Sequence, residues 1–182
     1  MNIRTVFITS KIICIVGESG SGKDTVASIL ETSYNLIPLK SYTTRKPRYE
    51  NEDTHIFISK EESKNYTDKV ASTFFDNNLY FATTQQVDNS DIYIIDVDGI
   101  YTLRARYKGE KEVIVVYLRT SKIKRFIRLC KRDGFIKALH RLNHDKYAFR
   151  FVNEVADYVV DNKGKPYEAA NIIYNLFKGG GE

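Results

Sequence analysis

The chain has 182 residues and a formal net charge of +5 at pH 7, from 28 Lys and Arg against 23 Asp and Glu. A hydrophobic fraction of 42% and a charged fraction of 28% are typical of one globular domain and argue against a disordered chain. The positive surplus indicates an anionic partner, and phosphate, nucleic acid and an anionic membrane are the candidates. Cys14 and Cys130 lie far apart among apolar neighbours, which favours reduced, buried thiols over a disulfide or a zinc site.

The N-terminal segment, residues 1–16, is superficially similar to a signal peptide because Arg4 precedes apolar residues. Lys11 interrupts the apolar run, however, and a glycine-rich loop follows where a cleavage site would be needed. No stretch approaches the about 18 apolar residues of a membrane span. We therefore expect a cytoplasmic protein with no membrane partner.

Four short apolar runs predict buried strands of a parallel sheet, at residues 12–16, 92–95, 113–118 and 158–160. Helical patterns follow these runs at 25–31, 101–107 and 121–131, and Pro166 opens a last helix. Strands that alternate with helices predict an α/β fold built from βαβ units. Residues 38–86 break this rhythm with two prolines and short extended pieces, and we expect them to form a small insertion over one end of the sheet.

A glycine-rich segment joins the first predicted strand to the first predicted helix, and it consists of Gly17, Glu18, Ser19, Gly20, Ser21, Gly22 and Lys23. Glycines let backbone N–H groups converge on a phosphate, the helix N-terminus adds partial positive charge, and the lysine reaches the outer phosphates. The segment therefore predicts a nucleotide-binding loop. Asp24 and Thr25 follow, where a Ser or Thr normally ligates magnesium directly after the lysine. Asp24 fits two interpretations, a metal ligand or a first-turn acid that stabilises the helix by about 0.3–1 kcal/mol.

Residues 41–48, SYTTRKPR, place the hydroxyl of Ser41 and the guanidinium groups of Arg45 and Arg48 within eight positions. Guanidinium groups offer planar, bidentate donors, which suit a phosphate monoester, whereas the alternative is a solvated basic loop. Together with the phosphate loop, this segment resembles the guanylate kinase family, whose corresponding stretch reads S-x-T-T-R-x-P-R. The resemblance implies that these three residues hold the phosphate of an acceptor nucleotide.

The resemblance also implies a fold, which is the three-layer P-loop NTPase fold with a parallel central sheet, a small acceptor-binding insertion and a short arginine-rich lid. We expect one domain over residues 1–182. Its core would comprise about 1–37, 87–127 and 142–178, with the insertion at about 38–86 and the lid at about 128–141.

Two acids at the end of a predicted strand, Asp96 and Asp98, are similar to the D-[ILV]-D pattern of the family. The resemblance implies that Asp96 serves the hydrated Mg²⁺, together with Asp24 or Thr25, and that Asp98 contacts the acceptor base. Acids at a strand end of an α/β sheet face the ligand crevice, which independently favours a functional role over an exposed turn.

Three arginines match the lid arginines of the family, which close over the triphosphate, and they are Arg128, Arg132 and Arg141. The gap before the last of these is shorter than in the family. Asn162 falls where the family places an asparagine beside the adenine of ATP.

The sequence departs from the family at the acceptor base. His55 and Phe81 stand where the family has tyrosines, although Thr83 is retained, and Ser72 stands where a glutamate reads guanine. The loss of a buried hydrogen-bond partner weakens discrimination of guanine. Asp24 and His55 are also similar to a relative of the same fold, ribose 1,5-bisphosphate phosphokinase, which lacks the pair of acids at 96 and 98.

The resemblance thus implies that the chain transfers the γ-phosphate of ATP, with Mg²⁺, to a nucleoside monophosphate, preferably GMP or dGMP. The catalytic residues would be Lys23, Arg45, Arg128, Arg132 and Arg141. The alternatives are a kinase of another deoxynucleotide or of ribose 1,5-bisphosphate, and a non-catalytic module that binds phosphopeptides. We expect no nucleic-acid partner, because the basic residues fall at positions that phosphate chemistry explains. The sequence carries no signal for an oligomeric state.

Overall fold

The computed structural model describes residues 10–179, so most of the N-terminal segment compared above with a signal peptide lies outside the described residues. A four-stranded parallel sheet forms the centre, in the order β6 (Ile92–Ile94), β1 (Lys11–Val16), β7 (Glu112–Arg119) and β8 (Tyr158–Asp161). The four predicted strands are therefore confirmed. The central strand, β1, is paired with β7 over its whole length, from Lys11 opposite Glu112 to Val16 opposite Tyr117.

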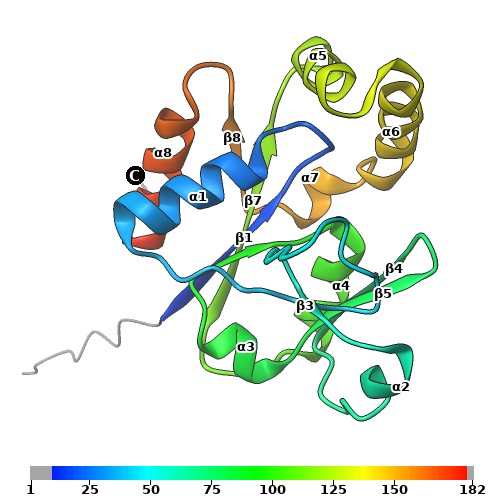
Figure 1. Ribbon diagram of the computed structural model, residues 1–182. Helices are drawn as coiled ribbons and strands as arrows, with labels where there is room; N and C mark the ends of the chain where they lie inside the picture. The colour runs from blue at the N-terminus through cyan, green and yellow to red at the C-terminus, as the bar shows by residue number, and fades with distance from the viewer. Residues whose placement is uncertain (1–9, 180–182) are drawn as a thin grey trace, which may run out of the picture.

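Helices cover both faces of this sheet (Figure 1). On one face, α1 (Lys23–Tyr34) and α8 (Pro166–Phe177) pack on the side chains of Ile13 and Ile15. On the other face, α4 (Val97–Arg106) and α7 (Val152–Val155) pack on a cluster that includes Cys14. Burial raises the pKa of the Cys14 thiol, which is fully enclosed, whereas Cys130 is half-buried. The expected α/β architecture with helices on both faces of a parallel sheet is present.

The predicted insertion forms a second sheet in the order β3 (Ile56–Phe57), β2 (Tyr42–Thr43), β5 (Asn78–Ala82) and β4 (Ala71–Phe75). Helix α2 (Lys60–Ser63) precedes β4, and α3 (Thr84–Asp88) follows β5. The hairpin between β4 and β5 turns at two residues with positive φ, Asp76 and Asn77, which is the conformation that tight hairpin turns need. The chain enters this sheet from Pro38, which bridges to Ile92 at the edge of the central sheet.

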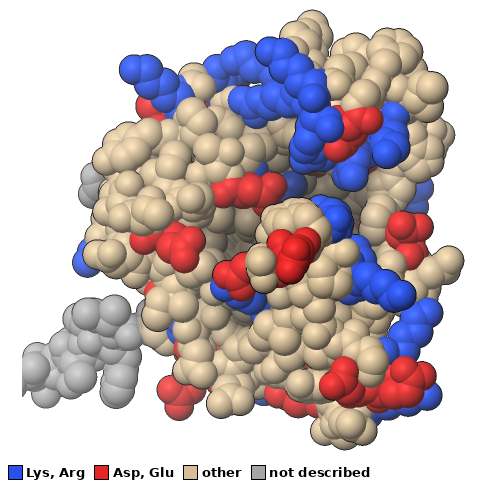
Figure 2. All heavy atoms as spheres, in the orientation of Figure 1, with Lys and Arg blue, Asp and Glu red and all other residues tan. Residues whose placement is uncertain are grey.

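Helices α5 (Lys122–Asp133) and α6 (Phe135–Ala148) form a pair above the end of the central sheet (Figure 1). Gly134, with φ of 84°, separates them and allows the reversal of the chain. The segment 128–141, expected as a lid, lies inside these two longer helices. On the face in Figure 2, Lys and Arg side chains gather over this pair and around a hollow beneath it. Within residues 10–179 no helix is both long and apolar enough to cross a membrane.

Candidate functional site

The predicted phosphate loop lies between β1 and α1, and its shape requires glycine at several positions. Gly22 has φ of 97° at the start of α1, and Gly20 has φ of 76°, both in the left-handed region. A Cβ atom on Gly17 would lie 2.8 Å from the carbonyl oxygen of Leu118, which is too close for any other residue. The glycines therefore let the loop run close to β7 and make the sharp turns that lead into α1.

Lys23, the first residue of α1, folds back over this loop. Its Nζ donates to the carbonyl oxygens of Gly17 at 2.6 Å and Glu18 at 3.4 Å. Burial lowers the pKa of the Lys23 ammonium, while three nearby carboxylates oppose the shift. The lysine is thus held at the loop by carbonyl groups that a phosphate can replace as its partners.

Three side chains from distant parts of the sequence donate hydrogen bonds to the carbonyl oxygens of the loop. The carbonyl oxygen of Ser21 accepts from Thr120 Oγ1 and Asn162 Nδ2, both at 2.9 Å, and from Arg128 Nη1 at 3.3 Å. Arg128 Nη1 also donates to the carbonyl oxygen of Gly20 at 3.0 Å. Arg128 and Asn162, expected at ATP, therefore contact the loop that is expected to bind the triphosphate.

Two predicted acceptor residues, 14 positions apart, meet at the second sheet. Ser41 Oγ lies 3.0 Å from His55 Nδ1. Burial lowers the pKa of His55, and the charges of Arg45 and Arg48 lower it further, so the imidazole is neutral at pH 7. A neutral imidazole and a hydroxyl have one donor each, so their bond to one another leaves one of the two donors for an anion.

Arg45 is held by a carboxylate that the sequence analysis did not single out. Its Nη1 and Nη2 donate to Glu52 Oε2 at 3.1 Å and Oε1 at 2.8 Å, and the Glu52 side chain is only 1% exposed. Hydrogen bonds from Arg45 and from the Arg48 amide hold the pKa of Glu52 well below its usual range. Arg45 Nε is buried without a hydrogen-bond partner among the described residues. One donor edge of the guanidinium is therefore used by Glu52, and the edge that contains Nε is left for another anion.

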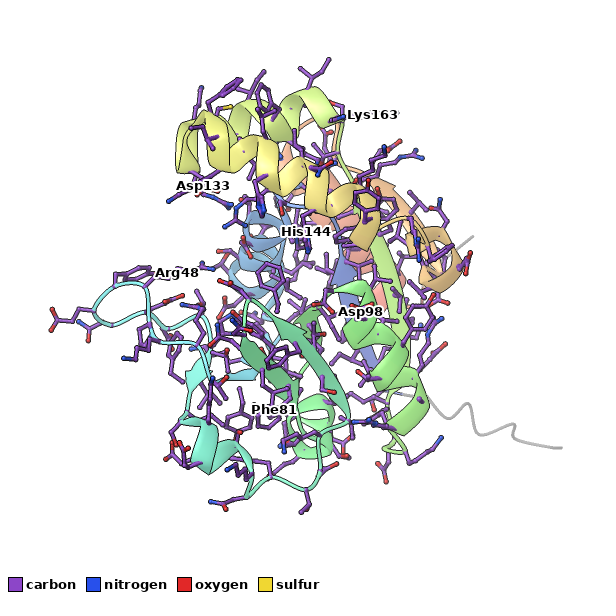
Figure 3. All side chains as sticks on the ribbon, turned by 90° about the vertical axis from the view of Figure 1, so that its right-hand side faces the viewer. Arg48, Phe81, Asp98, Asp133, His144 and Lys163 are labelled. Atoms are coloured by element: carbon purple, nitrogen blue, oxygen red, sulfur yellow. The ribbon has the colours of Figure 1, made fainter. Side chains whose placement is uncertain are left out.

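A cavity of about 380 Å³, here called the acceptor cavity, opens between the second sheet and α6. Its polar lining includes Ser41, His55, Asp96 and Asp98, and its aromatic lining comes from Tyr80, Tyr93, Phe74, Phe75, His144 and Phe149. In Figure 3, Asp98 and His144 lie on either side of the open region between the second sheet and the helical pair. The structure thus brings four of the predicted acceptor and metal residues into one cavity.

Asp96 has a structural role as well as a place in this cavity. Its Oδ1 caps α4 by accepting from the Gly99 amide at 2.7 Å and also accepts from Thr73 Oγ1 at 2.7 Å. Asp96 is exposed, and its carboxylate lines the cavity. Desolvation by the surrounding protein raises its pKa, and the two hydrogen bonds oppose that shift. Asp98 lies in the first turn of α4, so one helix start positions both acids.

Two of the three predicted lid arginines, Arg132 and Arg141, pair with one carboxylate, whereas Arg128 bonds to the glycine-rich loop. Asp133 Oδ2 lies 2.9 Å from Arg132 Nη2 and 3.1 Å from Arg141 Nε, and the hydrogen bonds from Arg132 lower the pKa of Asp133. These three residues line a cavity of about 420 Å³, here called the arginine cavity, with Lys23, Asp24, Arg48, Ser19 and Gly20. Figure 3 shows Arg48 and Asp133 facing one another from the second sheet and the helical pair. Acceptor-side and lid arginines are therefore collected around one space.

A third cavity, about 260 Å³ in volume and here called the donor cavity, lies beside α1 and contains Asp24, Thr25, Arg128, Arg132 and Asn162. Lys23 lines all three cavities. The donor cavity and the acceptor cavity therefore meet at one residue, Lys23.

The residues expected to serve Mg²⁺ have suitable chemistry for it. Asp24 and Thr25 present a carboxylate and a hydroxyl in the donor cavity, and Asp96 presents a carboxylate in the acceptor cavity. Within residues 10–179, no three His, Cys, Asp or Glu side chains are grouped as a ready-made metal site. Mg²⁺ is commonly held by one or two carboxylates, with phosphate oxygens and water completing its shell. The oxygen donors on either side of Lys23 fit an ion of this kind.

Four of the seven predicted acceptor residues do not line the acceptor cavity. Arg48 lines the arginine cavity instead, Arg45 lines none of the three cavities, and the other two are Phe81 and Thr83. Side chains alternate along β5, so Phe81 points away from the face on which Tyr80 lines the cavity. Phe81 lies in the part of the second sheet farther from the helical pair (Figure 3). Phe81 is fully buried and stacks on Tyr42 at a ring-centroid distance of 5.1 Å. Thr83 caps α3, where its Oγ1 accepts from the Gln86 amide at 3.3 Å. The expectation that these two side chains touch the acceptor is corrected, because strand alternation and helix capping fix them elsewhere.

Phe81→Ala is accordingly expected to lower the free energy of unfolding by about 3–5 kcal/mol, as for other large aromatic side chains removed from a core. Tyr80→Ala, one position earlier, is expected to raise the KM for the acceptor with a smaller loss of stability. Denaturant unfolding and acceptor titrations of both variants check this. A Phe81→Ala protein of normal stability with an impaired acceptor KM would contradict the placement.

Several residues at the site were missed by sequence reasoning. Tyr80 and Tyr93 line the acceptor cavity, while Glu52 and Asp133 hold the predicted arginines. The tyrosines lie in predicted extended segments. Because successive side chains of a strand point to opposite faces, the sequence could have predicted that one residue of each neighbouring pair faces the cavity. The two acids carry no local sequence pattern, since the role of each depends on the arginines that it pairs with. These are Arg45 for Glu52, and Arg132 and Arg141 for Asp133.

No protein-family description matches the chain, and no curated protein sequence matches it. Solved structures do resemble it. A guanylate kinase from Anaplasma phagocytophilum is 22% identical over 94% of this chain and 87% of its own, with a TM-score of 0.61. An uncharacterized protein from Eubacterium ventriosum is 18% identical over 92% of this chain and 98% of its own, with a TM-score of 0.53. At these identities the similarity concerns the fold, and the chain has an α/β fold similar to that of a guanylate kinase.

Proposed function

We propose that the protein transfers the γ-phosphoryl group of ATP to a nucleoside monophosphate, with GMP or dGMP as the preferred acceptor, and releases ADP and a nucleoside diphosphate. The observation that carries this proposal is the position of Lys23, which lines the donor, acceptor and arginine cavities together. The similarity in fold to a guanylate kinase supports the same reaction class.

Phosphoryl transfer depends mainly on the positioning of two substrates and on stabilisation of negative charge. Lys23 and the loop amides other than those of Ser19 and Ser21, which are bonded within the protein, would hold the donor phosphates at the start of α1. The helix dipole adds positive charge there. Arg132 and Arg141 border the same space and are kept near it by Asp133. Their guanidinium groups would stabilise the charge that spreads over the transferred group, with Arg128 acting on the donor side.

The acceptor phosphate would be held from the second sheet. Arg48 lines the arginine cavity, and Ser41 with neutral His55 lines the acceptor cavity. Arg45 would add its Nε edge, which has no partner among the described residues. Asp98 would accept from N–H groups of the base. This arrangement aims an oxygen of the acceptor phosphate at the donor phosphates beside Lys23.

Asp24, Thr25 and Asp96 are the residues that would hold Mg²⁺. Bound Mg²⁺ supplies neutralisation of charge at the phosphate oxygens. The residues of this chain orient the phosphates around it, and segment 128–141 would cover them and exclude water, which limits hydrolysis of ATP.

A phosphorylated sugar such as ribose 1,5-bisphosphate is a second candidate acceptor. Ser72 has no carboxylate, and its amide is already bonded to Thr102 Oγ1 at 2.8 Å. The position where the resembling family reads guanine therefore offers no acidic group to a base, which favours a smaller acceptor. The aromatic lining of the acceptor cavity favours a planar base instead.

The test is an assay of ADP release with MgATP and each nucleoside monophosphate, deoxynucleoside monophosphate and ribose 1,5-bisphosphate in turn. We expect one acceptor to exceed the others by about a hundredfold, as when a buried hydrogen-bonding site recognises its own substrate. The control omits the acceptor and measures ATP hydrolysis alone. Absence of acceptor-dependent ADP would refute the transfer and favour a module that only binds phosphorylated ligands.

A further inference from the structure

A buried network of charges joins the phosphate loop to the helical pair α5–α6. Asp145 on α6 and Arg125 on α5 are 4% and 5% exposed, and Arg125 Nη2 lies 2.6 Å from Asp145 Oδ2. Arg125 Nη1 also contacts Glu18 Oε1 at 2.8 Å, and Glu18 Oε2 accepts from the Tyr117 hydroxyl at 2.9 Å. Neither Arg125 nor Asp145 has a part in the transfer proposed above, so their burial calls for another explanation.

Both buried side chains contact Ser19, in the middle of the phosphate loop. The Ser19 amide donates to Asp145 Oδ2 at 2.9 Å, and Ser19 Oγ donates to Asp145 Oδ1 at 3.1 Å. Arg125 Nε donates to the Ser19 carbonyl oxygen at 3.0 Å. All three polar groups of this residue are therefore fixed by the helical pair.

We infer that Asp145 is a positioning residue, which holds the phosphate loop through Ser19 in the shape that receives the donor phosphates. The inference rests on the proposed function, since it takes ATP as the ligand of the loop. A loop of small residues has many conformations when unliganded, and a fixed anchor lowers the entropic cost of closing it around a phosphate.

The burial of Asp145 indicates a permanent anchor rather than a substitute for phosphate that ATP displaces. A buried carboxylate is costly unless it is paired and hydrogen-bonded, and here Arg125 and Ser19 meet both needs. If ATP displaced this carboxylate, the charge of Arg125 would lose its closest partner within the protein. The bonds to Ser19 are therefore expected to persist when ATP is bound.

Helix α6 also links this anchor to the reacting groups. Arg141 lies four residues before Asp145, hence on the same side of the helix, and it borders both the acceptor and the arginine cavities. Release of the anchor would disturb the loop and shift Arg141 at the same time. Loss of Asp145 should therefore reduce kcat as well as the affinity for ATP.

The experiment compares Asp145→Ala with Asp145→Asn in the full chain, with ATP binding measured by calorimetry and turnover with the best acceptor. Asp145→Ala is expected to weaken ATP binding about tenfold, because the Ser19 amide and hydroxyl lose a charged acceptor. Asp145→Asn is expected to restore most of the affinity, since its oxygen can accept from the amide and its nitrogen can donate to Ser19 Oγ. Asn143→Ala, exposed on the same helix, is the matched control and should bind ATP normally.

A charge-free variant separates positioning from stability, in case Asp145→Ala folds poorly. The combination Glu18→Gln, Arg125→Met and Asp145→Leu removes the whole network, and buried ion pairs replaced by apolar residues of similar size often leave a protein as stable as before. We expect this variant to unfold near the wild-type temperature and still to bind ATP about tenfold more weakly, because Ser19 lacks its anchor.

The inference is overturned if both Asp145→Ala and the charge-free variant bind ATP as well as the wild type. Tighter binding in either variant would also overturn it, because Asp145 would then compete with the phosphates. A wild-type protein that binds ATP but phosphorylates no acceptor would refute the proposed transfer and leave this test of binding intact. A wild-type protein that does not bind ATP would refute both.

Discussion

Replacement of Lys23 by alanine is expected to abolish phosphoryl transfer, with a fall in kcat of at least about 10³-fold. Lys23 borders all three cavities, so its ammonium is the group placed to act on donor and acceptor phosphates at once. When the ammonium is removed, its partners, the carbonyl oxygens of Gly17 and Glu18, remain. Carbonyl oxygens cannot stabilise the negative charge of a phosphate. The measurement is acceptor-dependent release of ADP at saturating concentrations of both substrates.

The Lys23→Ala protein should remain folded, because alanine has the highest helix propensity and Lys23 is the first residue of α1. Thermal unfolding checks this directly. Lys122→Ala, at the exposed first position of α5, is a matched control that removes the same charge at another helix start. A Lys23→Ala enzyme with turnover near that of the control would end the proposed assignment.

The second large effect is expected at Arg45. Arg45→Ala should lower kcat/KM for the acceptor by about 10²–10³-fold, as for the loss of other charge-stabilising donors, while leaving the affinity for ATP near the wild-type value. The reason is that the Nε edge of this guanidinium has no partner among the described residues, and we propose that it binds the acceptor phosphate. Acceptor titrations at saturating ATP, together with ATP binding, separate the two effects.

Arg45→Ala is also expected to affect stability, because it leaves the buried Glu52 carboxylate without its cation. An uncompensated buried charge destabilises the fold. The double variant Arg45→Met with Glu52→Gln removes both charges and should recover stability without recovering transfer. Lys46→Ala, exposed and adjacent, is the control for charge. If the double variant used the acceptor normally, Arg45 would have no role beyond its pairing with Glu52.

Strands β1, β6 and β7 could be predicted because they are largely buried on both faces and read as continuous apolar runs. β8 has the same apolar pattern, although Tyr158 and Val159 are exposed. Helix α6 could not be predicted. Its side chains at Phe135 and Ile136 are 62% and 82% exposed, so the apolar residues do not trace a single buried face. Hydrophobic periodicity reports burial, and it fails where apolar side chains face solvent.

In the candidate site too, features encoded by neighbouring residues could be predicted, and features that depend on residues far apart in sequence could not. The glycine-rich loop between β1 and α1 was predictable because seven consecutive residues encode its shape. The anchor of that loop, Asp145, lies 126 positions from Ser19 and resembles any other acid in a basic segment. Phe81 was wrongly assigned to the acceptor because alignment by resemblance does not say which face of a strand a residue occupies.

The order of strands in the central sheet has a consequence for how the chain folds. Among the described residues β1 is the first strand along the chain, yet its neighbours β6 and β7 begin at Ile92 and Glu112. The sheet must therefore close through contacts between residues far apart in sequence, which is the slow class of folding step. During synthesis, the apolar strand that leads into the phosphate loop stays without its partners until residues near Arg119 have left the ribosome.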